Sequence, residues 1–181
     1  MTQQVLRWLP GNGWLIFSGG DDGHGAIRSE ALARALVDGG AAYLSFAEDG
    51  GDALLEDMDD LGAPAGYLLD PRSEDVESIQ ALVQEASIIV LEAGERIDDL
   101  LRNLQEPVQI ALQVAYERGA VLLFERLAIN LLGRWALSDS GDLFEGWHWL
   151  QDAFLEPGAQ GMDSSLAVQR ILSLEAEAVA I

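Results

Sequence analysis

Five apolar runs, each ended by turn-forming residues, alternate with helical patterns and restrict the fold of this chain more than any other feature. The runs read WLIFS from Trp14, AAYLSF from Ala41, AGYLLD from Ala65, SIIVLE from Ser87 and AVLLFE from Ala120. Apolar residues occupy both faces of the runs, which is typical of parallel strands covered by helices on two sides. The alternation predicts an α/β three-layer sandwich around a mostly parallel sheet of five or more strands.

The 181 residues fit a single α/β domain covering 1–181. Its core strands and helices are expected over residues 14–134. Beyond residue 134, strand and helix patterns no longer alternate. Residues 135–181 predict an irregular segment with a short hairpin over one sheet edge. This segment is expected to end with a last helix capped by Ser164 or Ser165 and an edge strand at 178–181.

The chain is strongly acidic, with 31 acidic and 10 basic residues and a formal net charge of −21. Affinity for phosphate groups comes mainly from Lys and Arg, so we expect neither nucleic acid nor a membrane as partner. No apolar run reaches the roughly eighteen residues of a membrane span. The N-terminus lacks the basic flank and apolar core of a signal peptide. These observations predict a cytoplasmic protein.

Two residue types are missing from the sequence: every basic residue is arginine, and there is no cysteine. The absence of lysine excludes a phosphate-loop lysine, a Schiff base and a Ser-Lys dyad. The absence of cysteine excludes disulfides, thiolate metal sites and a cysteine nucleophile. The two histidines, His24 and His148, lie far apart and lack the spaced partners of a metal site. We therefore predict no metal and no cofactor.

Residues at the carboxyl ends of the predicted strands define a candidate pocket, because ligands on parallel α/β sheets bind beyond these ends. Its members are Ser18, Gly19, Gly20, Glu92, Gly94, Glu95, Arg96, Glu125 and Arg126.

Four segments, taken in order, resemble the cyanophycinase and dipeptidase E group of serine peptidases, from about Trp14 to Ile181. They are GWLIFSGGDDGHGAIRSEALARAL, ASIIVLEAGERIDDLLRNL, PVQIALQVAYERGAVLLFERLAINLLG and LEPGAQGMDSSLAVQRIL. The resemblance implies a flavodoxin-like, class I glutamine amidotransferase-like sandwich with a serine nucleophile on the turn after the fifth strand.

The residues that carry the chemistry of this family are replaced. The resemblance places Arg126 at the serine nucleophile and Ser165 at the histidine, while Gly94 keeps one glycine of the oxyanion loop. A guanidinium stays protonated and cannot attack a carbonyl. We therefore expect a catalytically inactive homologue that acts as a binding or assembly protein. The alternative is a hydrolase with altered catalytic residues, with Glu125 or Glu95 as general base.

The turn itself is also expected to change. Phe124 falls at one of the glycines that flank the nucleophile, and Leu127 follows Arg126. Small neighbours let a strand and a helix approach closely at a nucleophile elbow. These bulky residues therefore predict that the tight turn is lost.

Arg126 has two interpretations. In the first, it pairs with Glu92 or Glu95 and seals the former site, so that its removal is destabilising. In the second, a pocket remains in which Arg126 binds a small acidic or peptide ligand. A homodimer is a further expectation, because residues 178–181 and the segment around Trp147 are apolar.

For the other candidate sites, a structural role explains the residues better than a functional one. Ser18 has two aspartates and His24 nearby in sequence, but sequence neighbours seldom converge into a triad, and a capped glycine-rich turn explains them better. Asp21, Asp22 and Asp70 resemble the Mg²⁺ pocket of receiver domains, yet the lysine that this pocket needs is missing. His148, between two tryptophans, is expected to pack rather than to act as a base.

Overall fold

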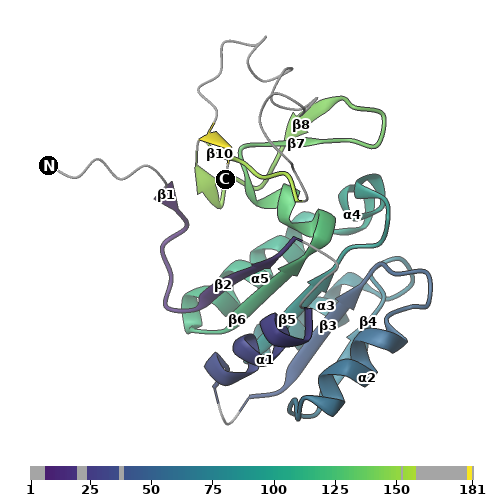
Figure 1. Cartoon of the computed structure of the whole chain (residues 1–181), viewed down its shortest axis with the longest axis vertical. Coiled ribbons are helices and arrows are strands. Elements are labelled where there is room, and N and C mark those ends of the chain that lie inside the picture. Colours follow the sequence, from purple (N-terminus) through teal and green to yellow (C-terminus); the bar gives the residue numbers. More distant parts are fainter. Residues whose placement is uncertain (1–6, 20–23, 37–38, 152, 158–178, 181) are drawn as a thin grey trace, which may run out of the picture.

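The computed structural model describes residues 7–19, 24–36, 39–151, 153–157 and 179–180 (Figure 1). Five strands form a fully parallel sheet in the order β2-β6-β5-β3-β4. They are β2 (Trp14–Ser18), β3 (Ala41–Ser45), β4 (Gly66–Leu69), β5 (Ile88–Glu92) and β6 (Val121–Glu125). The predicted α/β fold with a parallel five-stranded sheet is confirmed.

Helices cover both faces of this sheet (Figure 1). The helices are α1 (His24–Arg34), α2 (Asp52–Asp60), α3 (Val76–Glu85), α4 (Ile97–Asn103) and α5 (Glu106–Arg118). The α1 and α2 helices share one hydrophobic cluster with Tyr43, Val90 and Leu123 of the strands. The α3 and α5 helices share the other cluster with Leu44, Leu91 and Leu122. Successive strand residues alternate between the clusters, which is why each run is apolar on both faces.

Local residue chemistry explains where several helices begin and end. The Asp75 carboxylate accepts a hydrogen bond of 2.9 Å from the Ser78 amide and caps α3. Helix α5 has a proline in its first turn and ends at Gly119, whose φ of 116° is favourable only for glycine. Among the helices that the structure describes, none is long and apolar enough to cross a membrane.

The chain beyond β6 forms a short 3-10 helix, η1 (Arg126–Leu132), and small strands. The predicted hairpin is confirmed, because β7 (Trp135–Leu137) pairs antiparallel with β8 (Leu143–Glu145). A second sheet has the order β11-β10-β7-β8, with β10 at Ala153–Phe154 and β11 at Val179–Ala180. The strand expected at 178–181 thus joins this small sheet rather than the main one. The predicted last helix lies outside the described residues.

One further pair of strands connects the start of the described chain with the segment after β8. Strand β1 (Arg7–Trp8) pairs antiparallel with β9 (Leu150–Gln151). Together with the second sheet, this pair places the chain after β6 beyond one end of the main sheet, as Figure 1 shows.

Candidate functional site

Polar side chains form a row across the carboxyl ends of four neighbouring strands. Ser18 lies in register with Glu125, Glu125 with Glu92, and Glu92 with Ser45. Ser18, Ser45 and Glu125 are buried, and Glu92 is partly buried. The sequence placed Ser18, Glu92 and Glu125 in the candidate pocket, and the structure brings these three together. Ser45 was missed because it lies inside an apolar run.

Arg28 of helix α1 supplies the positive charge of this row. Its Nε and Nη2 donate to Glu125 Oε1 and Oε2 at 2.9 and 2.7 Å, which is a two-pronged contact. Its Nη1 donates to Asp57 Oδ2 of α2 at 2.6 Å, and its Nη2 lies 4.0 Å from Glu92 Oε1. The sequence offered Arg126 as a partner of Glu92 or Glu95, and the structure adds Arg28 as a cation beside Glu92. One guanidinium, 5 % exposed, thus connects carboxylates of two strands and a helix.

The sequence contained a signal for Arg28. It precedes Ala31 and Leu32 by three and four residues, so it lies on the apolar stripe of its helix. A charged residue in such a stripe is buried with a partner or reaches out of the core. Nothing in the sequence alone identifies Glu125 as that partner.

Burial raises the pKa of Glu92 above its usual range, and the negative charge of Glu125 adds to the rise. The Ser45 hydroxyl donates to Glu92 Oε2 at 2.6 Å and, together with Arg28, limits this effect. Glu92 therefore holds its proton to a higher pH in the folded state than in the unfolded chain.

Replacing Glu92 by glutamine is expected to stabilise the protein increasingly as the pH rises. Wild-type stability falls as the pH rises from the ordinary value of 4.5 through the raised pKa, because the unfolded chain releases its proton first. Glutamine does not ionise and still accepts from Ser45, so the variant lacks this fall. Urea unfolding of both proteins across this pH range measures the difference, and a difference that stays constant or shrinks with pH contradicts the assignment.

The tight turn after β6 is present, contrary to the expectation from its bulky residues. Arg126 has a φ of 54°, in the left-handed region, and joins β6 directly to η1. Phe124 does not obstruct the turn, because its ring packs in the core at 6.3 Å from the ring of Trp147 and 5.9 Å from that of Trp149. The Arg126 side chain is exposed. The turn after β6 thus has an arginine in the left-handed region of the backbone.

Arg126→Gly is expected to be about 1 kcal/mol more stable than Arg126→Ala, because only glycine adopts a positive φ without strain. Both variants remove the same guanidinium, so their difference reports the backbone alone. Thermal and urea unfolding of the two variants measure it. Equal stability, or a more stable alanine variant, would show that the turn is not strained.

In the loop after β5, Gly94 belongs to the predicted pocket, and the structure gives a steric reason for a glycine at this position. A Cβ on Gly94 would lie 2.3 Å from the carbonyl oxygen of Phe46, so no larger residue fits without a shift of the backbone. Glu95 and Arg96 follow and are exposed. Arg96 Nε donates to Asp139 Oδ2 at 3.2 Å, and the Ile97 amide donates to Asp139 Oδ1 at 3.0 Å. These contacts attach the loop to the β7–β8 hairpin.

A cavity of about 290 Å³ lies between this loop, η1 and the hairpin. Its lining residues are Glu95, Ile97, Leu127, Asn130, Leu137, Ser138, Asp139, Phe154, Glu156 and Pro157. Among the predicted pocket residues that the structure describes, Glu95 alone belongs to this lining, and Leu127 follows Arg126 directly. Asn130 is buried, and its Oδ1 accepts no hydrogen bond within the described part of the chain. Sequence reasoning missed Asn130 because it follows a run of apolar residues.

The remaining predicted residues are only partly described. Gly19 lies against Pro157, since a Cβ there would be 3.4 Å from the Pro157 Cβ. Gly20, Asp21, Asp22 and Ser165 lie outside the described residues, as does the side chain of His24.

Two other polar candidates have structural partners. Asp70 Oδ1 accepts from Arg72 Nε at 2.8 Å. Burial opposes ionisation of Asp70, but the hydrogen bonds from Arg72 outweigh it and lower the pKa of this carboxyl. His148 is exposed, and its Nε2 lies 2.8 Å from Glu145 Oε1. Within the described ranges, no three acidic or histidine side chains are grouped as they would be to hold a metal ion.

Comparison with known proteins finds a similarity in fold but none in sequence. No family model and no curated protein matches this sequence. Solved structures do match, among them two with probability 1.00. A peptidase from an acI-B1 Actinobacterium has a TM-score of 0.69 and 16% identity, over 93% of this chain and 80% of that chain. A putative peptidase E protein from Listeria monocytogenes EGD-e has a TM-score of 0.65 and 12% identity, over 93% and 90%. The chain has the fold of these peptidases.

The peptidase E-like fold confirms the part of the resemblance that concerns architecture. At identities this low, what the three chains share is the arrangement of strands and helices. The chemistry of this chain therefore has to be argued from its own residues.

Proposed function

We propose that this chain is a catalytically inactive relative of the cyanophycinase and peptidase E group, and that it binds a small acidic or peptide ligand. The observation that carries the proposal is Arg126 in the left-handed turn between β6 and η1. An arginine at the position of the attacking group has no lone pair to offer at working pH. Its guanidinium is instead suited to hold a carboxylate.

The contacts of Glu125 argue against it as a substitute base. Both of its oxygens accept hydrogen bonds from Arg28, and the residue is 1 % exposed. A general base needs a free oxygen within hydrogen-bond reach of the proton that it removes. Glu125 thus serves to hold Arg28 rather than to move a proton.

The cavity beside the turn supports a peptide as ligand. Its lining contains Leu127, the residue after Arg126 in the chain, and Glu95, whose charge is opposite to that of Arg126. A dipeptide offers a carboxylate to the guanidinium of Arg126 and an ammonium group to Glu95. The apolar side chains of Ile97, Leu137 and Phe154 provide contact for the rest of such a molecule.

The test measures hydrolysis and binding on one preparation. Substrates are β-aspartyl dipeptides, dipeptides with an N-terminal aspartate, and cyanophycin, and binding of the same dipeptides is followed by calorimetry. We expect no turnover, and binding that weakens by about tenfold or more in Arg126→Gln, because a charge-assisted hydrogen bond contributes about 1.5–3 kcal/mol. Arg72→Gln, which removes an exposed arginine paired with Asp70, is the matched control.

Three outcomes contradict the proposal. Turnover that disappears in Ser18→Ala would identify an active serine hydrolase. Turnover that disappears in Glu95→Gln would support a hydrolase with altered catalytic residues. Dipeptide binding that is equal in Arg126→Gln and Arg72→Gln would remove Arg126 from the site.

A further inference from the structure

The two edge strands of the main sheet differ in their protection against pairing with another strand. Strand β4 is followed by Asp70 and Pro71 and lies beside the acidic helix α2. Charges and proline are the features by which sheet edges avoid pairing. Strand β2 has no such charge: residues 8–19 include Pro10 ahead of the strand but no ionisable side chain, in a chain with a net charge of −21. Within the part of the chain that the structure describes, β2 pairs only with β6.

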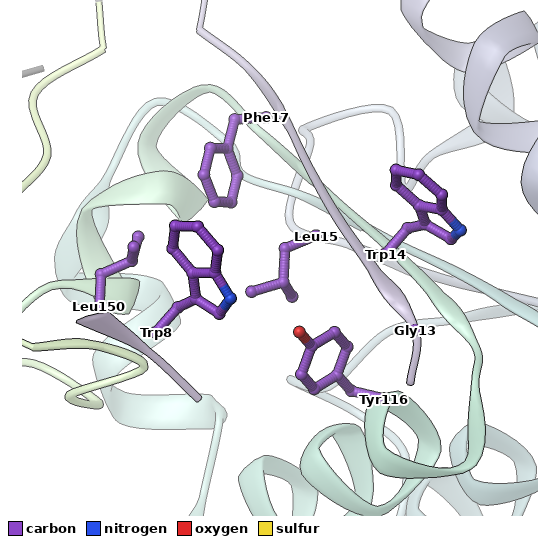
Figure 2. Close-up of a pocket in the computed structure, with 7 residues that line it drawn as sticks. All are labelled: Trp8, Gly13, Trp14, Leu15, Phe17, Tyr116 and Leu150. Atoms are coloured by element: carbon purple, nitrogen blue, oxygen red, sulfur yellow. The ribbon is translucent and has the colours of Figure 1, made fainter. Parts of the chain in front are cut away.

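Large apolar side chains are exposed along β2. Trp14 is 51 % exposed, Phe17 38 % and Trp8, on the neighbouring β1, 53 %. Figure 2 shows residues that line a cavity of about 280 Å³ along the strand. Trp8, Leu15, Phe17 and Tyr116 lie on one side of the strand, and Trp14, which also belongs to the lining, lies on the other side. The edge is therefore apolar on both faces of the sheet, which is unusual for a strand that meets only water.

The cation that contacts Trp14 is paired with a carboxylate. Arg34 Cζ lies 4.7 Å from the centre of the Trp14 ring, and the guanidinium of Arg34 is paired with Glu30 of the same helix. The surface that surrounds the edge thus adds no net charge of its own at this point.

We infer that the β2 edge is covered by the β2 strand of a second copy of this chain. Two copies with a charge of −21 each repel one another wherever their charged surfaces face. Contact is therefore most favourable where both surfaces are uncharged, and residues 8–19 provide this on each copy. A partner of opposite charge would find no carboxylate on this edge to bind.

A two-fold axis gives the pairing a defined geometry, since it brings the same patch of both copies together. An axis that passes beside Ile16, midway between the two strands and perpendicular to the sheet, makes the strands antiparallel and extends the sheet across both copies. Leu15 then lies opposite the partner's Phe17 on the side of the cavity, because directly opposite residues of an antiparallel pair share a face. The inference is independent of the proposed function, because it rests on β2 and not on Arg126.

Light scattering and sedimentation of the full chain, from low to high micromolar concentration, test the inference. We expect a particle of twice the 19.5 kDa of one chain, and conversion to the monomer in Trp14→Lys. In this register position 14 lies opposite the partner's Ser18, so each lysine brings a charge into the otherwise uncharged contact and removes an exposed tryptophan from it. Tyr67→Lys is the matched control, since Tyr67 is an aromatic residue 60 % exposed on the opposite edge strand, β4.

Amide hydrogen exchange locates the contact without a substitution. Protection of residues 14–18 should rise with protein concentration, while protection of residues 66–69 should not. A chain that stays monomeric at the highest concentration overturns the inference, whatever other protein binds the edge. So does a dimer that Trp14→Lys leaves intact, provided that circular dichroism shows the variant to be folded.

Discussion

Replacing Arg28 by methionine should lower the free energy of unfolding by about 3–5 kcal/mol, the largest effect expected from any single charge in this chain. The substitution deprives the buried Glu125 carboxylate of two charged donors and leaves it close to Glu92. Urea unfolding followed by tryptophan fluorescence measures the loss.

Two further variants separate the buried pair from general effects of charge. Arg34→Met removes an arginine whose partner, Glu30, is exposed, and should cost less than about 1 kcal/mol. The double variant Arg28→Met with Glu125→Leu removes both buried charges and should recover most of the stability. If Arg28→Met costs no more than Arg34→Met, the contact between Arg28 and Glu125 does not hold the strand ends together.

Phe124→Ala should destabilise the protein by about 3–5 kcal/mol, as expected for a large aromatic side chain removed from a packed core. Phe124 is fully buried on an interior strand, and its ring meets Trp147 and Trp149 edge-on. Its loss should therefore also change the fluorescence of these tryptophans in the folded state.

Tyr67→Ala is the control for this substitution. Tyr67 is also an aromatic strand residue, but it is mostly exposed, so its removal should change the stability by no more than about 0.5 kcal/mol. Similar losses in the two variants would mean that Phe124 does not pack in the core as described. The turn after β6 would then be stabilised by other residues.

The sequence predicted the sheet well because strand and helix periodicities are local properties. Each of the five runs is apolar on both faces, and each became a strand of the parallel sheet. The polar row at the carboxyl ends was predicted in part, since Ser18, Glu92 and Glu125 each end a run. Its positive charge was not, because Arg28 reaches Glu125 across 97 positions of sequence.

Side-chain direction explains the other errors. The sequence shows that Phe124 is bulky but not that its ring points into the core, away from the turn. Alternation along β6 places Phe124 in one hydrophobic cluster and Leu123 in the other, which is the side of α1 and Arg28. Glu125 follows Leu123 by two positions and therefore faces Arg28. This relation becomes visible only once the strand order is known.

The left-handed backbone at Arg126 has a consequence for how such a protein changes its activity. Ala128 and Leu132 of η1 are completely buried, so the short helix must begin where β6 ends, whichever side chain stands between them. The packing of η1 in the interior thus determines the reversal of the chain after β6, and the side chain of the residue at the turn does not. Evolution on this scaffold can replace one tip residue by another without rebuilding the main chain beneath it.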